Sequence, residues 1–96
     1  MLDWKDVTCY SQGQRGKIPP NSWQVKRGKI AIWVSCAHRF YPDEWVMACH
    51  SLNIEGKSLG KISDISEDVA KGSAVNIATC LALGLYEEMI ALRDAT

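Results

Sequence analysis

Three side chains that could hold a metal ion lie close together in the sequence: Cys36, His38 and Cys49. Structural zinc sites take four cysteine or histidine ligands, usually with C-x-x-C or H-x-x-x-H spacing. Neither spacing occurs here, and His50 follows Cys49 directly, so on a strand it points to the opposite face. The sequence therefore favours small cysteines that fill a core, and we predict no metal and no cofactor.

The same residues could instead form a cysteine–histidine nucleophile pair. Such a pair needs a thiolate beside an oriented base in an open cleft. The sequence marks no third orienting residue, no oxyanion-binding turn and no common catalytic or nucleotide-binding motif. We therefore predict that the protein is not an enzyme. Its four widely spaced cysteines are expected to be reduced thiols: Cys9, Cys36, Cys49 and Cys80.

Basic side chains gather on the loops and turns that we expect in the strand-rich part of the chain. They are Arg15, Lys17, Lys26, Arg27 and Lys29. Cationic loops close to aromatic side chains can bind a nucleic-acid strand through its phosphates and by stacking on its bases. However, the net charge of the chain is zero and no nucleic-acid module signature is present. Nucleic-acid binding is therefore the alternative function. If these residues bind no nucleic acid, they form a solvated basic edge that prevents sheet aggregation.

An aromatic-and-arginine group marks a candidate protein-binding surface. It consists of Trp33, Arg39, Phe40 and Tyr41. Tryptophan, tyrosine and arginine are enriched among the residues that dominate protein–protein binding energy. Two alternatives stay open, because the apolar residues 2–10 could also fold over Trp33 and cover it.

Two hairpins are expected to position these residues. Arg27–Gly28 predicts a two-residue turn, since glycine adopts the positive φ that such turns need, and this turn sets Val25 opposite Ile30. Residues 41–44 (YPDE) predict a second turn. A second loop of two or four residues places Met47 on the face of Ile30, whereas three or five residues would reverse the faces.

With the first of these registers, both faces of the sheet are apolar. One face carries large side chains, and the other carries mostly small ones around Trp33, with Val46 and Leu52. A helix can cover only one face of a sheet. We also expect residues 2–10 to form an edge strand anchored by Trp4, and a short fourth strand to run through Leu59.

The last third of the chain predicts a helix from about Ser66 to Leu83, with either Asp64 or Ser66 as its N-cap. Apolar residues recur there at helical spacing. An unbroken helix to Asp94 would extend for about 43 Å, longer than a compact domain of this size is wide, so Gly84 is the natural break. Residues 85–92 would then turn back or project outward.

Size and composition indicate one domain over residues 1–96, with a strand-rich, basic part (1–62) and a helical, acidic part (63–96). The net charge is +4 for residues 1–61 and −4 for residues 62–96. The longest apolar run, residues 80–86, is shorter than the roughly 20 residues of a spanning helix, and no secretory signal is visible. We expect a cytoplasmic protein without a membrane segment.

The layout resembles small phage- or prophage-encoded accessory proteins, among them several anti-CRISPR proteins. The similar stretches are WKDVTCYS, PPNSWQV, EWVMAC and SEDVAKGSAVNIA. The resemblance implies a non-enzymatic inhibitor, active in a bacterial host cell, that blocks a surface of a CRISPR–Cas or other defence complex, often where nucleic acid binds. Acidic residues could then mimic phosphates: Glu67, Asp68, Glu87 and Glu88. The net charge of zero departs from the strongly acidic character of DNA mimics.

Together these observations predict an α+β domain, with an antiparallel sheet of three or four strands and a C-terminal helix on one face. The predicted function is stoichiometric protein binding, of which a homodimer is one form.

Overall fold

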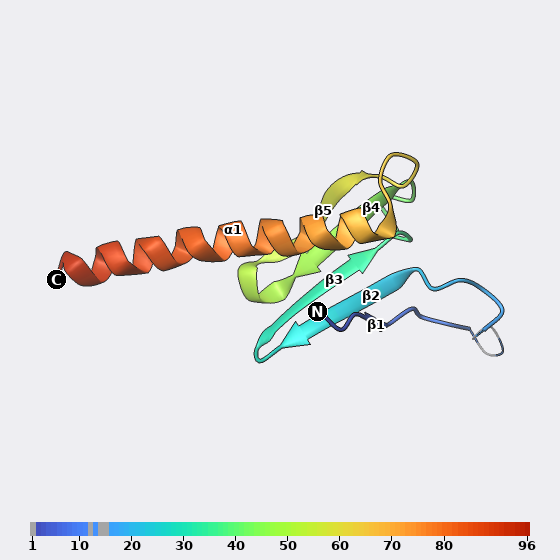
Figure 1. Ribbon diagram of the computed structural model, residues 1–96, viewed down its shortest axis with the longest axis horizontal. Coiled ribbons are helices and arrows are strands. Elements are labelled where there is room, and N and C mark those ends of the chain that lie inside the picture. The colour runs from blue at the N-terminus through green and yellow to red at the C-terminus, as the bar shows by residue number, and fades with distance from the viewer. Residues whose placement is uncertain (1, 12, 14–15) are drawn as a thin grey trace.

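A long helix crosses one face of an antiparallel sheet (Figure 1). The computed structural model describes residues 2–11, 13 and 16–96. Within them, neighbours in the sheet are neighbours in the chain: β1 (Lys5–Asp6), β2 (Ser22–Arg27), β3 (Ile30–Ser35), β4 (Glu44–Cys49) and β5 (Ile54–Lys61). The 3₁₀ turn η1 (His50–Leu52) links β4 to β5, and α1 (Glu67–Asp94) follows the sheet. The predicted α+β class is confirmed, with five strands in place of three or four.

The first hairpin turns at Gly28 and Lys29, one residue later than predicted. Gly28 has a φ of 60°, and Lys29 does not share the positive φ, a combination typical of a type II′ turn. Val25 therefore pairs with Ile32 instead of Ile30. Because this correction shifts each pairing by two positions, every side chain still lies on the face that we predicted.

The second hairpin has a longer loop than predicted. β3 ends at Ser35 and β4 begins at Glu44, so residues 36–43 form the loop in place of two or four residues. The predicted turn is present, because the Glu44 N–H donates to the Tyr41 carbonyl at 3.2 Å. Val34 pairs with Met47, so the predicted faces of this hairpin are also confirmed.

The core lies between the bulky face of the sheet and the first half of α1. Its buried members are Trp23, Val25, Ile32, Val34, Trp45, Met47 and Cys49 from the strands, with Ala70, Ala74 and Ala78 from the helix. The three alanines are spaced by four residues and so form one stripe. Their exposed fractions are 0%, 0% and 5%, which shows that the helix lies close against the strands.

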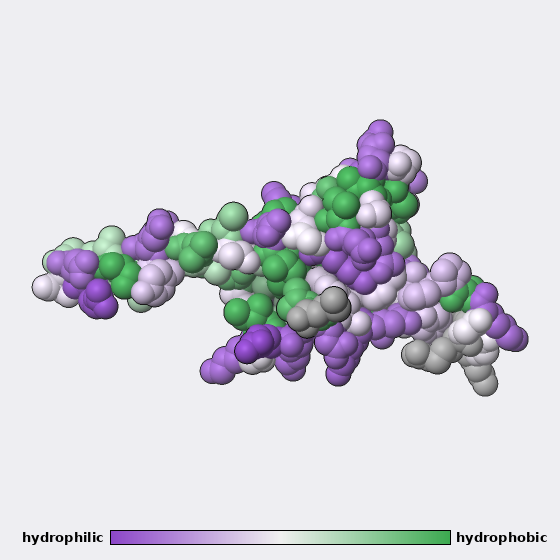
Figure 2. Space-filling model, viewed as in Figure 1, coloured by the Kyte–Doolittle hydropathy of each residue, from purple (hydrophilic) through white to green (hydrophobic). Residues whose placement is uncertain are grey.

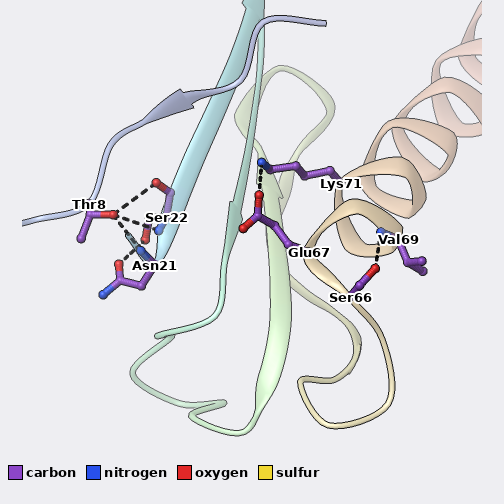
Figure 3. A network of polar contacts seen from close by, with 7 residues as sticks. All are labelled: Thr8, Asn21, Ser22, Ser66, Glu67, Val69 and Lys71. Atoms are coloured by element: carbon purple, nitrogen blue, oxygen red, sulfur yellow. Dashed lines mark hydrogen bonds and ion pairs between the residues drawn. The ribbon is translucent and has the colours of Figure 1, made fainter. Parts of the chain in front are cut away.

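The N-terminus of α1 is fixed by Ser66, one of the two predicted caps. Its side-chain oxygen accepts a hydrogen bond from the Val69 N–H at 3.2 Å (Figure 3). The negative charges of Glu67 and Asp68 in the first turn stabilise the helix, because they lie at the positive end of its dipole. The Trp45 indole donates to the Ile65 carbonyl at 3.2 Å and ties the residues before the helix to the sheet.

The helix continues through Gly84 without the expected break. It has 28 residues, and the molecule measures 58 × 27 × 26 Å. Ala78 is the last helix residue in the core, so residues 81–94, here called the overhang, project beyond the sheet (Figure 1). A glycine inside a helix costs only about 1 kcal/mol relative to alanine, which is too little to force a break.

Residues 2–10 follow the edge of the sheet rather than its second face. Lys5 pairs with Gln24, which confirms the predicted edge strand. The segment is held by Thr8, which is 6% exposed and whose hydroxyl accepts hydrogen bonds from the Asn21 and Ser22 N–H groups at 2.9 and 3.1 Å (Figure 3). At the other edge, β5 pairs with β4 through two register shifts.

Candidate protein-binding surfaces

The second face of the sheet, opposite α1, exposes less apolar surface than predicted. Trp33 is half-buried there and lies edge-on to the His50 ring, with 5.2 Å between the ring centroids. Val46 is only 3% exposed, and both Val46 and His38 lie beside Gly56, which places part of the 36–43 loop at this face. Leu52 packs against the core instead of joining Trp33, because the chain turns into η1 after Cys49.

The 36–43 loop gathers three of the predicted contact residues. The Arg39 guanidinium lies 5.8 Å from the centroid of the Phe40 ring, and the His38 ring lies 5.3 Å from the ring of Tyr41. Phe40 is 76% exposed. The fourth predicted residue, Trp33, pairs with His50 on the sheet and is not part of this aromatic loop.

The four predicted acidic residues lie in two separate places. Glu67 forms an ion pair of 2.6 Å with Lys71, whose ammonium group lies 4.7 Å from the centroid of the Trp23 ring (Figure 3). Glu87 and Glu88 lie on the overhang, about 30 Å farther along at 1.5 Å per residue. Asp68 stays near Glu67 in the first turn, so the four carboxylates do not form one phosphate-like surface.

The predicted basic residues are also divided. Arg15 lies outside the described residues. Lys17 precedes β2, whereas Lys26, Arg27 and Lys29 surround the turn at the other end of this strand, about 20 Å away for six residues. Lys26 and Arg27 are successive on the strand and so point to opposite faces.

The cysteine and histidine residues do not assemble a reactive site. Burial raises the pKa of the half-buried Cys36 thiol, and the negative charge of Glu67 adds to this rise, so the thiolate is disfavoured. Cys49 is fully buried in the core, and His38 lies beside Gly56. Among the residues that the structure describes, no three histidine, cysteine or carboxylate side chains come together as a possible metal site.

The overhang is an exposed apolar surface. We predicted two contact residues on it, Glu87 and Glu88, but not its apolar side chains. Six of its large apolar side chains are between 41% (Leu81) and 64% (Tyr86) exposed: Leu81, Leu83, Leu85, Tyr86, Met89 and Leu92, whereas Ile90 is half-buried. No charged residue occurs between Lys71 and Glu87. Apolar patches line the projecting helix in Figure 2. The signal was present in the run CLALGLY, which is apolar on every side of a helix, a pattern found in helices that are buried.

A groove lies where the tip of the β2–β3 hairpin diverges from α1. It has a volume of about 430 Å³. Its apolar lining comprises Leu2, Val25, Ile30, Ile32 and Val75, and its charged lining comprises Asp3, Lys5, Lys26 and Arg27. Ile30 is 47% exposed at the hairpin tip. The groove borders α1 at Val75, six residues before the overhang begins, and its charged lining is mainly basic.

By length and composition, α1 could also cross a membrane. Its first half, however, is fixed to the sheet through Ala70, Ala74 and Ala78. The overhang alone is about 21 Å long, compared with a hydrocarbon core of about 30 Å, and it contains Glu87 and Glu88. This geometry favours a protein contact over a membrane span.

No protein-family model matches the chain, and neither a curated protein nor a solved structure shows significant similarity to it. The surfaces of the molecule are therefore the basis for assigning its function.

Proposed function

We propose that the protein is a non-enzymatic protein-binding module whose main contact surface is the overhang. The observation that carries this proposal is the exposure of its leucine and methionine side chains on a helix that the sheet supports only as far as Ala78. A helical segment of this length without tertiary contacts is only marginally stable in water. Binding to another protein surface would both bury the apolar side chains and stabilise the segment.

The aromatic loop offers a second contact area at the other end of the sheet. Arg39, Phe40 and Tyr41 combine exposed aromatic surface with a positive charge. Residues of this kind supply much of the binding energy in protein interfaces. A partner could bind this loop without contacting the overhang.

The narrower proposal, inhibition of a CRISPR–Cas or other defence complex in a bacterial cell, rests on the resemblance described above. In that case the effect follows from occupation of an interface, with one inhibitor bound per target and no turnover. Glu87 and Glu88 on the overhang are the acidic residues best placed to meet such a target, since Glu67 already pairs with Lys71.

Nucleic-acid binding remains the alternative, and the three cations at the β2–β3 turn favour it: Lys26, Arg27 and Lys29. Their division between two faces of the sheet is a weaker arrangement for following a phosphate backbone than a continuous basic stripe.

The proposed function is tested by immobilising the full chain and the Leu85→Glu variant in equal amounts and adding either bacterial lysate or untagged chain. We expect the wild type to retain a protein in stoichiometric amount, and the variant to retain at least tenfold less, because burying an unpaired carboxylate costs several kcal/mol. Lys57→Glu, on the exposed surface of β5, is the matched control and should retain as much as the wild type.

Equal retention by the wild type and Leu85→Glu would contradict the proposal. Retention of nucleic acid alone, weakening steeply with salt, would favour the alternative.

A further inference from the structure

We infer that the overhang binds a second copy of this chain, with the two α1 helices antiparallel and each overhang seated in the groove of the other copy. This inference rests on the proposed function, because it identifies the partner of the same surface.

One side of α1 carries the repeat of a coiled coil. The positions separated alternately by three and four residues are Val75, Ala78, Ala82, Leu85, Met89 and Leu92. Apolar residues at this spacing form the contact seam of paired helices. Val75 lines the groove, Ala78 belongs to the core, and the residues from Ala82 onward lie on the overhang.

A single antiparallel register gives the layers outside the core one smaller and one larger side chain each. With the two-fold axis between residues 82 and 85, these layers are Val75 with Leu92 and Ala82 with Leu85, whereas Ala78, the position opposite Met89, is covered by the sheet of its own copy. Layers of similar total volume fill a helix–helix interface without voids. A parallel pair would instead place alanine on alanine and methionine on methionine, with gaps in some layers and crowding in others.

The charges also favour the antiparallel arrangement of the two helices. The overhang carries Glu87, Glu88 and Asp94 against Arg93, a net charge of −2, whereas Lys26 and Arg27 lie at the edge of the groove. Antiparallel helices bring the acidic end of each copy towards the basic hairpin tip of the other. A parallel pair would place two acidic ends together and two sheets at the same end.

The buried area requires the groove as well as the helices. The seam from Val75 to Leu92 is about 26 Å long, and a helix is about 11 Å wide, so a helix pair alone buries on the order of 600 Å² in total. Stable interfaces start at about 1,200 Å². Contact of Leu92 with the exposed Leu2 and Ile30 of the other copy, repeated by the two-fold symmetry, supplies the additional area.

The experiment is analytical ultracentrifugation of the full chain from about 1 to about 100 µM, compared among four variants, since dimer populations follow concentration. Leu85→Ala leaves alanine opposite alanine in the two central layers, and Ala82→Leu leaves leucine opposite leucine. We expect each to raise the dimer dissociation constant at least tenfold. The double variant restores one small and one large residue per layer and should return to within about threefold of the wild type.

Leu83→Ala is the matched control. Leu83 is 57% exposed on the same overhang but lies on the other side of the helix from the seam. We expect its dimer dissociation constant to equal that of the wild type, and circular dichroism should show that all four variants keep the helix.

Monomeric wild-type protein at every concentration would overturn the inference, and so would a dimer that the double variant fails to restore. If the wild type is monomeric but captures another protein, and Leu85→Glu abolishes this capture, the proposed function holds and only the identity of the partner is wrong. If it binds phosphatidylcholine vesicles and no protein, the proposed function fails as well.

Discussion

Replacing Ala74 by leucine is expected to destabilise the protein strongly. Ala74 is fully buried in the middle of the alanine stripe, and it belongs to the same core as Val34 and Met47, which are also at 0% exposure. A leucine at this position adds three carbon atoms where the helix lies close against the strands. The helix must then move away from the sheet, or neighbouring side chains must leave their preferred rotamers.

Overpacking of this kind typically costs about 1–3 kcal/mol, and the absence of exposure at Ala74 places the expected loss in the upper half of this range, about 2–3 kcal/mol. For a domain of this size, 1 kcal/mol lowers the melting temperature by about 4–8 °C. The predicted decrease for Ala74→Leu is therefore about 10–20 °C.

The assay is thermal unfolding followed by circular dichroism at one fixed protein concentration, because self-association also raises the melting temperature. Ala91→Leu is the matched control, since Ala91 is exposed on the overhang and leucine has a helix propensity close to that of alanine. We expect the control to melt within about 3 °C of the wild type, corresponding to about 0.5 kcal/mol or less. An Ala74→Leu variant that melts with the control would refute the close contact between helix and sheet.

Two further predictions concern Thr8 and the cysteines. Thr8→Val removes the hydroxyl that accepts two backbone N–H bonds, and it should lower the free energy of unfolding in urea by about 2–3 kcal/mol; stability equal to that of the wild type would show that water replaces the hydroxyl. At about pH 8, iodoacetamide should modify the exposed Cys80 at least tenfold faster than Cys36, because burial raises the pKa of Cys36 and lowers its thiolate fraction. Raising the pH towards the pKa of Cys36 should narrow the difference between the two modification rates, which are measured by mass spectrometry. Equal rates at about pH 8 would contradict the burial of Cys36.

The side-chain faces of the sheet could be predicted from the sequence, but the pairing of the first hairpin could not. Alternation of apolar and polar residues fixes which face each residue of β2 and β3 occupies. Both Arg27–Gly28 and Gly28–Lys29 place glycine at a turn position, so composition alone does not choose between them. The observed turn puts Gly28 first, and this choice shifts each pairing by two residues without changing the faces.

Projection of residues 85–92 was one of two alternatives, but the break at Gly84 was predicted wrongly because the expectation of a compact domain outweighed helix propensity. A break at Gly84 would have kept the molecule short, but residues 85–92 contain strong helix formers, and the glycine alone does not stop the helix. The run CLALGLY carries no polar side of its own. On the function proposed above, these apolar side chains contact the surface of another protein.

The candidate contact surfaces were predicted only in part, because their grouping depends on how distant parts of the chain come together. Residues that are neighbours in sequence, Arg39, Phe40 and Tyr41, stay together in the aromatic loop. Trp33 is separate from them, because β3 ends at Ser35 and residues 36–43 form a loop. Groups that depend on tertiary placement, such as the groove beside Val75, have no local sequence signal.

The two edges of the sheet have a consequence for the behaviour of concentrated protein. β1 contains only two residues, and at the opposite edge β5 departs from regular pairing twice, with its glycines Gly56 and Gly60 at φ values of 126° and 128°. Such short or bulged borders give an incoming strand few aligned N–H and C=O groups. Fibril growth by strand addition is therefore disfavoured, so contacts between copies at high concentration should involve the exposed apolar side chains of α1 rather than the sheet edges.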